Sequence, residues 1–317
     1  MKNYTPPVKS SWKGRDSDRV LYLHEKVDCQ IITHLPKHTT GFALLGYACD
    51  IGVKRNQGRI GAKNGSAEIR KALGKMPNHL EAHQKITDVG DIHCQSQDLE
   101  ETQKALSDAV TTLLDKNLFP LLMGGGHDMA YAHYNGIKNH LLSKGKRPSI
   151  GIINFDAHFD LREDTQGANS GTPFYQISNE NEPFHYLCLG IRKDANDRKL
   201  FETAHELDVT YVERNTFRIQ FAKEINTWIR AFMDKVDHIY VSVDLDGFSS
   251  AYAPGVSAPS PMGFSPDIVS QSLDTIIASG KLISMDIAEM NPVYDVDGQT
   301  AKLAASLMHQ IVHSEFS

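Results

Sequence analysis

Three short segments of the sequence combine carboxylates and imidazoles with glycine or apolar residues. In residues 156–160, Asp156, His158 and Asp160 alternate with apolar residues directly after an apolar run. Because side chains two residues apart on a strand point to the same face, these three groups are predicted to lie on one side of the strand's end. Charged groups in such a place are costly unless something compensates them, and a metal ion would do so.

Two further segments repeat this pattern. Asp244 and Asp246 flank Leu245 at the end of another apolar run, and His127 follows three consecutive glycines, residues 124–126. A glycine turn lets the chain bend sharply and places the histidine at the start of the next helix. Because α/β sheets bind ligands at the edge where their strands end, all three segments are predicted to share that edge.

The spacing predicts two ions rather than one. Asp156 and Asp160 would be roughly 13 Å apart on a straight strand at ~3.3 Å per residue, so one ion could not readily take the whole segment. Two ions about 3.5 to 4 Å apart, bridged by carboxylates, could use every candidate as the strand end curls, and would lower the pKa of a bridging water for hydrolysis. The predicted ligands include no thiolate and favour a hard ion such as manganese: His127, Asp156, His158, Asp160, Asp244 and Asp246.

Apolar runs and amphipathic segments alternate along the chain, and these elements must position the candidate ligands. The runs predicted as strands buried on both faces are residues 42–47, 118–123, 149–155, 186–190, 209–212, 238–245 and 282–287. Amphipathic segments of helical length include residues 99–116, 129–144, 218–235, 266–279 and 300–313. The alternation predicts a mainly parallel sheet covered by helices on both faces, and its strand number would also fit a closed barrel. We expect a single domain over residues 1–317, with residues 1–35 as an N-terminal extension.

Composition and charge narrow the class of protein. The 317 residues carry 33 Lys and Arg against 39 Asp and Glu, a formal net charge of −6. This mildly acidic chain has no extended basic face for nucleic acid, and no segment approaches the ~18 consecutive apolar residues of a membrane span. We therefore expect a cytoplasmic homo-oligomer that acts on a small-molecule substrate, without nucleic-acid or membrane partners. The four cysteines have no CxxC spacing and are expected to be reduced thiols.

The three ligand-bearing segments, GGGHD, DAHFD and SVDLDGF, resemble in order and spacing those of the ureohydrolase superfamily of arginase, agmatinase and formimidoylglutamase. The resemblance covers about residues 40–312. It implies a three-layer α/β/α sandwich with a parallel sheet of about eight strands. It also implies two Mn²⁺ per subunit on the six residues named above, and contact between Glu289 and the amidine or guanidine group of the substrate.

Within the superfamily, the variable segments look most like those of formimidoylglutamase: residues 49–62, 170–174, 190–192 and 253–259. Arginases carry a proton-shuttling histidine just before the position of Gly171, where this chain has Ser170, and the usual Asp-Pro after the last metal pair is Ser249-Ser250. The resemblance implies hydrolysis of N-formimidoyl-L-glutamate to L-glutamate and formamide in histidine degradation. The implied step is attack of a metal-bridging hydroxide on the formimidoyl carbon.

Further residues receive expected roles in that reaction. Glu289, paired with the amidinium, and Asp160 are the expected catalytic residues. The two carboxylates of the substrate favour arginine partners. The candidates for substrate binding are Asn56, Arg59, Arg162, Arg192 and Glu289, and for each of the arginines a salt bridge or a backbone-carbonyl contact is an equally good expectation.

Other residues near these segments are predicted either to support the site or to lie outside it. Asp128 is expected to cap the following helix and to support the site. His133, His140 and His185 are expected on helix surfaces or in loops, and Asp286 either supports the site or bonds backbone groups.

Other functions stay open at this point. An agmatinase or another guanidino-acid ureohydrolase would share every metal ligand but would release urea. A non-catalytic relative would keep only the fold, and deacetylase-type chemistry occurs on a related fold. The intact ligand set and Glu289 favour a binuclear hydrolase.

Overall fold

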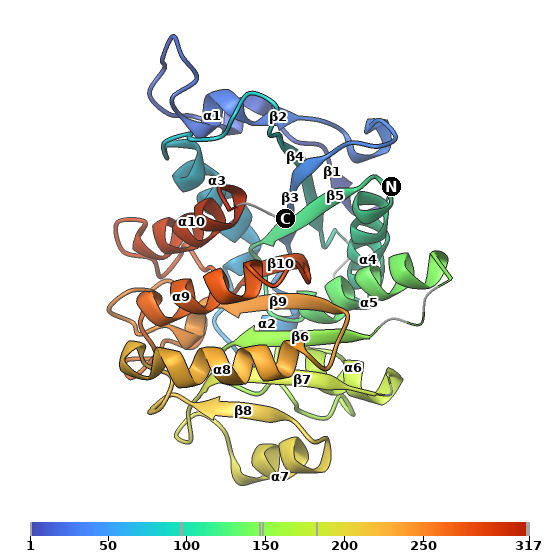
Figure 1. Cartoon of the computed structure of the whole chain (residues 1–317), viewed down its shortest axis with the longest axis vertical. Helices are drawn as coiled ribbons and strands as arrows, with labels where there is room; N and C mark the ends of the chain where they lie inside the picture. The colour runs from blue at the N-terminus through green and yellow to red at the C-terminus, as the bar shows by residue number, and fades with distance from the viewer. Residues whose placement is uncertain (1, 96–97, 146, 148, 182, 315–317) are drawn as a thin grey trace.

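The computed structural model describes residues 2–95, 98–145, 147, 149–181 and 183–314 (Figure 1). Its strands are β1 (Tyr4–Thr5), β2 (Asp28–Cys29), β3 (Gly41–Ala48), β4 (Ile86–His93), β5 (Leu118–Met123), β6 (Ile150–Phe155), β7 (His185–Ile191), β8 (Thr210–Glu213), β9 (His238–Asp244) and β10 (Leu282–Ala288). Its α-helices are α1 (Leu23–Lys26), α2 (Ile51–Arg55), α3 (Gly65–Gly74), α4 (Leu99–Asp115), α5 (Met129–Ser143), α6 (Pro173–Glu180), α7 (Arg198–Glu206), α8 (Ala222–Met233), α9 (Pro266–Ile277) and α10 (Gln299–Val312).

The strands form one open sheet. Their order is β1-β4-β3-β5-β10-β9-β6-β7-β8, and β2 pairs with β4 beside this path. In the described part of the chain, the pairings are parallel except for that of the two-residue β1 with β4. Because β1 and β8 lie at opposite edges, the sheet is not a barrel, and the sandwich that the family resemblance implied is confirmed.

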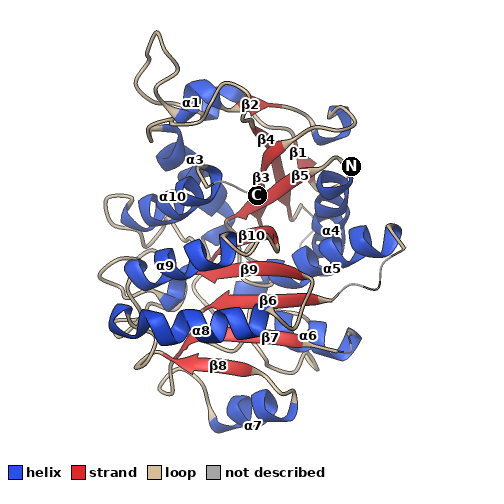
Figure 2. Ribbon diagram, viewed as in Figure 1, coloured by secondary structure: helices blue, strands red, loops and turns tan. Residues whose placement is uncertain are grey.

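Helices cover both faces of the sheet (Figure 2). Helices α3, α8, α9 and α10 pack on one face, and α4, α5, α6 and α7 pack on the other. Along β3, Phe42 and Leu44 join the first core, whereas Ala43 and Leu45 join the second. Burial on both faces explains why the strands appear as unbroken apolar runs. Within the described residues, no helix has the length and apolar character needed to cross a membrane.

The seven predicted strands and five predicted helices are present, with ends shifted by at most four residues. The largest shift is at the start of α8, because Ile219–Phe221 forms a separate 3₁₀ helix. Strand β4 was not predicted, since Asp88 and Asp91 interrupt its apolar pattern. Arg70 of α3 pairs with Asp88 at 2.9 Å and with Asp91 at 2.8 Å, which compensates these charges beside the sheet.

Residues 2–35, the described part of the predicted N-terminal extension, pack at the β4 end of the sheet. Strand β1 pairs with β4, and β2 pairs with the same strand. Trp12 and Leu23 are buried in the core that α3 covers, and the Trp12 indole N–H donates to Asp88 at 2.8 Å. The segment is therefore part of the packed structure.

Candidate metal centre

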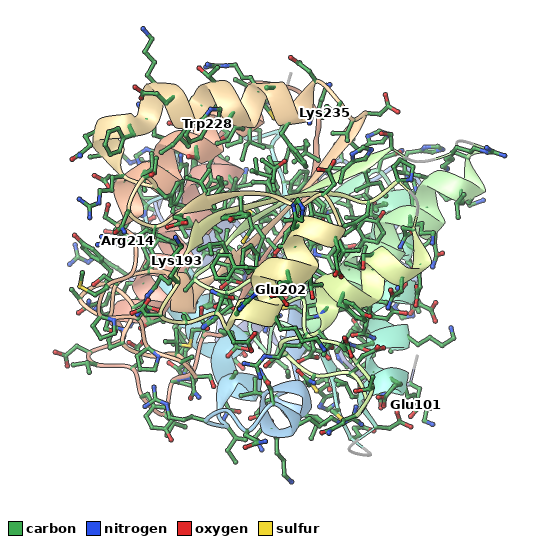
Figure 3. All side chains as sticks on the ribbon, turned by 90° about the horizontal axis from the view of Figure 1, so that it is seen from below. Glu101, Lys193, Glu202, Arg214, Trp228 and Lys235 are labelled. Atoms are coloured by element: carbon green, nitrogen blue, oxygen red, sulfur yellow. The ribbon has the colours of Figure 1, made fainter. Side chains whose placement is uncertain are left out.

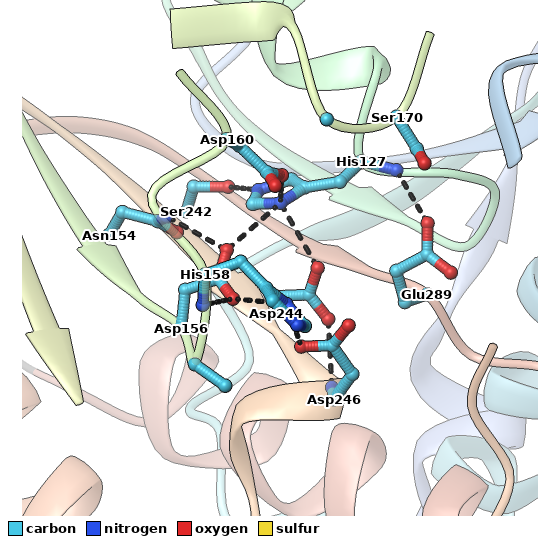
Figure 4. Close-up of polar contacts among 12 residues, drawn as sticks. His127, Asn154, Asp156, His158, Asp160, Ser170, Ser242, Asp244, Asp246 and Glu289 are labelled. Carbon is cyan, nitrogen blue, oxygen red and sulfur yellow. Dashed lines mark hydrogen bonds and ion pairs between the residues drawn. The ribbon is translucent and has the colours of Figure 1, made fainter. Parts of the chain in front are cut away.

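The predicted ligands meet at the edge of the sheet where β5, β6 and β9 end (Figure 4). Each of two groups has ligand atoms that lie within 4.8 Å of one another. The first group is His127, Asp156, Asp160 and Asp244, and the second is Asp156, His158 and Asp246. The structure thus brings all six predicted ligands together, with Asp156 common to both groups.

His127 is at the centre of the first group. Its Nδ1 lies 2.8 Å from an oxygen of Asp160, 3.0 Å from one of Asp244 and 3.3 Å from one of Asp156. In the second group, Nδ1 of His158 lies 3.3 Å from Asp246 and 3.4 Å from Asp156. Each group therefore combines one imidazole nitrogen with two or three carboxylates.

The chain curls at the end of β6, as the two-ion arrangement predicted from the sequence requires. Strand β6 ends at Phe155, and the chain then turns, with the backbone of Asp160 in the left-handed region at φ +50°. Both carboxylates consequently face the same imidazole. Non-glycine residues adopt this backbone conformation at a cost of about 1 to 3 kcal/mol, and such residues cluster at functional sites.

The electrostatics of the two groups fit a pair of divalent cations. Burial, together with the charge of Asp156, raises the pKa of Asp160 to about 6. Burial and the charge of Asp244 raise the pKa of Asp246 well above its usual range. Among the described residues, Nδ1 of His127 and Oδ1 of Asp246 are buried without a hydrogen-bond partner. Cations between these groups would stabilise the carboxylates and use the free atoms as ligands.

Hydrogen bonds behind the site determine which nitrogen of His127 faces the carboxylates. The Ser242 hydroxyl donates to Oδ1 of Asp286 at 2.6 Å, and its oxygen lies 2.8 Å from Nε2 of His127. Since a hydroxyl has one hydrogen, Ser242 must accept from Nε2–H. In the neutral ring, Nδ1 then keeps its lone pair, as a metal ligand requires. Asp286 thus supports the site through Ser242, which settles the alternative left open for it.

Glu289 follows β10 and approaches the first group from the side (Figure 4). Its Oε1 accepts from the backbone N–H of His127 at 2.9 Å, while Oε2 is buried without a partner among the described residues. Its backbone is also left-handed, at φ +65°. Burial, together with Asp244 and Asp246, raises the pKa of Glu289 well above its usual range. A cationic group beside Oε2 would favour the carboxylate.

Asp128 stands at the N-cap position of α5, but its predicted side-chain cap and the surface position predicted for His133 are wrong. The side chain of Asp128 makes no cap hydrogen bond with the described residues of α5 and instead accepts from the Tyr47 hydroxyl at 2.7 Å. Burial raises the pKa of Asp128 to about 7. His133 is not on a helix surface, since it is fully buried against Asp286. By contrast, His140 lies near the surface of α5 and contacts Asp115 at 2.7 Å.

A cavity of about 330 Å³ opens onto the ligands and contains part of the predicted substrate-binding set. Asn56, Arg162, Ser170 and Glu289 all line it. The Arg162 guanidinium donates to Oδ1 of Asn56 at 3.3 Å, and Nδ2 of Asn56 donates to the Ser170 hydroxyl at 3.0 Å. These contacts form a polar wall in the cavity that the metal ligands also line. Arg162 itself is exposed and lines the cavity.

Arg59 also lines this cavity, but its guanidinium is engaged in holding a loop. Nε donates to the carbonyl of Ser257 at 2.9 Å, and a terminal nitrogen donates to the carbonyl of Val256 at 2.6 Å. The guanidinium also lies 3.8 Å from the ring centroid of Tyr294. Arg59 therefore makes backbone-carbonyl contacts, which was one of the roles expected for it.

Arg192 is not brought to the ligands. It lines a separate cavity of about 270 Å³ together with Lys193 and Arg214. Figure 3 shows these last two residues close together. Its guanidinium binds the carboxylate of Asp194 and donates to the Ser260 hydroxyl at 2.7 Å. Arg192 therefore forms a salt bridge, which was one of the roles expected for it.

Two supporting residues of the site were missed in the sequence. Asn154 donates to Asp156 at 3.0 Å, and Ser242 contacts His127 as described above. Each is two residues before the first ligand carboxylate of its strand, so both point to the ligand side. Extending the period-two pattern backwards along β6 and β9 would have identified them.

Curated relatives resemble this chain over nearly its whole length. A formimidoylglutamase of Aeromonas salmonicida (strain A449) is 40% identical, over 98% of this chain and 99% of the relative. Another, of Geobacillus sp. (strain WCH70), is 41% identical, over 98% of this chain and 96% of the relative.

Solved structures share the fold. The formimidoylglutamase from Bacillus subtilis subsp. subtilis str. 168 has a TM-score of 0.83 at 22% identity, covering 95% of this chain and 93% of that one. The Trypanosoma cruzi formiminoglutamase solved with Mn²⁺ has a TM-score of 0.77 at 22% identity, covering 89% and 95%. The model of the Arginase family matches residues 40–313. The sequence, the sheet and the cluster of acids and histidines agree with this match, and the chain belongs to the arginase family.

Proposed function

We propose that this chain is a formimidoylglutamase that hydrolyses N-formimidoyl-L-glutamate to L-glutamate and formamide. The main observation in favour of a hydrolase is that the two ligand groups and Oε2 of Glu289 lie at one cavity. Among the described residues, this Oε2 has no hydrogen-bond partner. The choice of substrate is supported by relatives of that name that are about 40% identical over nearly the whole chain.

Two Mn²⁺ ions are part of the proposal. His127, Asp156, Asp160 and Asp244 would hold one ion, and Asp156, His158 and Asp246 the other. A ligand set of carboxylates and imidazoles without thiolate suits manganese. When bound, such a pair of cations supplies Lewis acidity and lowers the pKa of water toward neutrality.

Glu289 would orient the substrate. Because the His127 N–H holds Oε1, Oε2 would accept an N–H of the amidinium and direct the formimidoyl carbon toward the ligand groups. The carboxylate would also stabilise positive charge on the amidine during attack.

Asp160 would move the proton from water to the leaving nitrogen of glutamate. Its side chain is 11% exposed, against 3% for Asp244 and 7% for Asp246, so it is the most accessible of these carboxylates at the cavity. Proton transfer by a positioned carboxylate contributes about 10²- to 10⁴-fold to such reactions.

The glutamate part of the substrate would bind at the polar wall. Arg162 offers the charge for a carboxylate, and Asn56 and Ser170 offer further hydrogen bonds. Arg59 would act indirectly by holding residues 256–257 at the cavity. Arg192 is not retained as a substrate ligand, because its partners are Asp194 and Ser260.

Turnover by purified, manganese-reconstituted protein tests the proposal. The substrates are N-formimidoyl-L-glutamate, agmatine, arginine and 4-guanidinobutyrate, and the products scored are formamide and urea. We expect formamide from the first compound and no urea from the others. Urea release would support a hydrolase activity but contradict the proposed substrate. A failure to bind manganese would contradict the proposed metal centre.

The remaining expectations belong to the same proposal. They are a place in histidine degradation, a cytoplasmic location, a single domain and a homo-oligomer. Light scattering of the purified protein would test the oligomer, and an oligomer is the expected result.

A further inference from the structure

A second buried histidine lies beneath the metal centre. His133, in the middle of α5, is 0% exposed and is not a predicted ligand. Its Nδ1 lies 2.6 Å from Oδ2 of Asp286, and its Nε2 lies 2.6 Å from the hydroxyl oxygen of Ser284. The ring packs against Tyr240, with centroids 4.6 Å apart. Both ring nitrogens therefore have a polar partner in an environment closed to solvent.

The hydrogen positions around His133 follow from counting donors. The Ser284 hydroxyl donates its single hydrogen to the carbonyl of Pro120 at 2.8 Å. Its oxygen must therefore accept from Nε2–H of His133. Nδ1 faces the carboxylate of Asp286, which also accepts from the Tyr240 hydroxyl. With a carboxylate at Asp286, both ring nitrogens of His133 carry hydrogens, so the ring is an imidazolium ion paired with Asp286.

Asp286 connects this ion pair to the metal centre. Its Oδ1 accepts from Ser242, which in turn accepts from Nε2–H of His127. The chain of contacts from His133 through Asp286 and Ser242 therefore orients the imidazole that faces three ligand carboxylates. A buried carboxylate without its cationic partner is strongly unfavourable. Loss of His133 would disturb Asp286 and, through it, the orientation of His127.

We propose that His133 is a positioning residue of the metal centre: its imidazolium holds Asp286 as the carboxylate that, through Ser242, directs Nδ1 of His127 at the first metal. The inference rests on the proposed metal centre and does not depend on which substrate the enzyme takes. Changes to residues that orient a ligand from behind typically weaken metal binding by about 10- to 100-fold.

Metal binding to three variants tests the inference. Free Mn²⁺ is measured by electron paramagnetic resonance during titration of metal-free wild type, His133→Leu, His133→Gln and Ile137→Ala. Ile137 lies one turn further along α5 and is 0% exposed, so its truncation controls for loss of packing. We expect His133→Leu to weaken binding of one of the two ions by about tenfold or more. His133→Gln should recover part of this loss because its amide can donate to Asp286, and Ile137→Ala should bind both ions normally.

The protonation of His133 supplies a second test, which is measured on the wild type. In ¹⁵N-histidine-labelled wild type, the His133 signals, assigned by their absence in His133→Gln, should both have the shifts of protonated ring nitrogens. A signal from an unprotonated nitrogen would overturn the ion pair. Equal Mn²⁺ affinity of wild type and His133→Leu would overturn the positioning role, whereas wild type that binds no Mn²⁺ would overturn the metal centre and the inference with it.

Discussion

At the scale of single residues, Glu289 shows how the backbone prepares a side chain for its task. The His127 N–H occupies Oε1, the Glu289 N–H donates to the carbonyl of Gly125 at 2.8 Å, and Oε2 is left at the wall of the cavity. Glu289, with its left-handed backbone, is thus held by hydrogen bonds to Gly125, inside the glycine turn, and to His127, directly after it. A carboxylate placed in this way is suited to binding a substrate cation.

Glu289→Gln should therefore affect catalysis and not metal content. The amide oxygen can still accept from His127, but the negative charge beside the amidinium is lost. We expect kcat/KM for N-formimidoyl-L-glutamate to fall by about 10²- to 10³-fold, the range seen when a group that stabilises transition-state charge is removed. Steady-state kinetics and metal analysis check this. Unchanged kinetics with full metal content would remove Glu289 from the mechanism.

Arg162→Ala, with Arg192→Ala as the matched control, tests the placement of the substrate carboxylates. A hydrogen bond to a charged group contributes about 1.5 to 3 kcal/mol, which corresponds to roughly a 10- to 100-fold increase in KM when it is lost. We expect this increase for Arg162→Ala with little change in kcat, and no change in either constant for Arg192→Ala. The opposite pattern would place the substrate near the second cavity.

The predicted ligands illustrate what residue patterns can and cannot reveal. His127, Asp156 and Asp244 were predictable because period-two alternation and a glycine turn are local properties of strand ends. The burial of His133 was not, because its partner Asp286 is far away in the chain. Arg192 ends a strand as expected, yet the nearby Asp194 takes its guanidinium.

At the scale of elements, compensation between distant segments limits prediction. Asp88 and Asp91 make β4 look unlike a strand until Arg70, on α3, is known to lie beside them. Strands β3, β6 and β9 needed no such partner and were predicted from their apolar residues alone. Elements that rely on their own pattern are therefore predictable, and elements stabilised by a remote charge are not.

The end of α10 carries a contact that depends on pH. Nδ1 of His313 lies 2.8 Å from the carbonyl of His309, and Nε2 accepts from the backbone N–H of His79 at 3.1 Å. Burial, with further contributions from His309 and His79, lowers the pKa of His313 below its usual value. The unfolded chain therefore binds a proton at a pH where the folded one does not. The stability from this contact is fully present above about pH 6.5, the pKa of a histidine in the unfolded chain. It is lost as the pH falls through the lower pKa that His313 has in the folded state.

His313→Gln should flatten this dependence. Between pH 7 and pH 5, the melting temperature of wild type should decrease more than that of the variant, since only wild type has the neutral imidazole to protonate. Differential scanning calorimetry at both pH values provides the measurement. Parallel decreases in the two proteins would show that His313 does not contribute to the acid sensitivity.

At the scale of the whole molecule, the two ligand groups join parts of the chain that are far apart in sequence. Removing bound cations should therefore lower global stability, because the carboxylates would repel one another in a buried space. At 100 times the dissociation constant, a ligand stabilises the folded state by about 2.7 kcal/mol. For a chain of this size we expect a decrease of roughly 4 °C in Tm for each bound ion that a chelator removes. Restoring Mn²⁺ should reverse it, and an unchanged Tm would contradict cation binding at these residues.

Strand β10 is the last strand of the chain, yet it lies between β5 and β9 (Figure 1). Before residues 282–288 have been synthesised, the nascent chain can form only two separate half-sheets. One of them carries His127, and the other carries Asp156, His158, Asp160, Asp244 and Asp246. Insertion of β10 joins the halves and adds Glu289, so residues 282–289 must have been synthesised before the first metal group can assemble. A nascent chain that stops short of β10 therefore cannot present a complete metal centre.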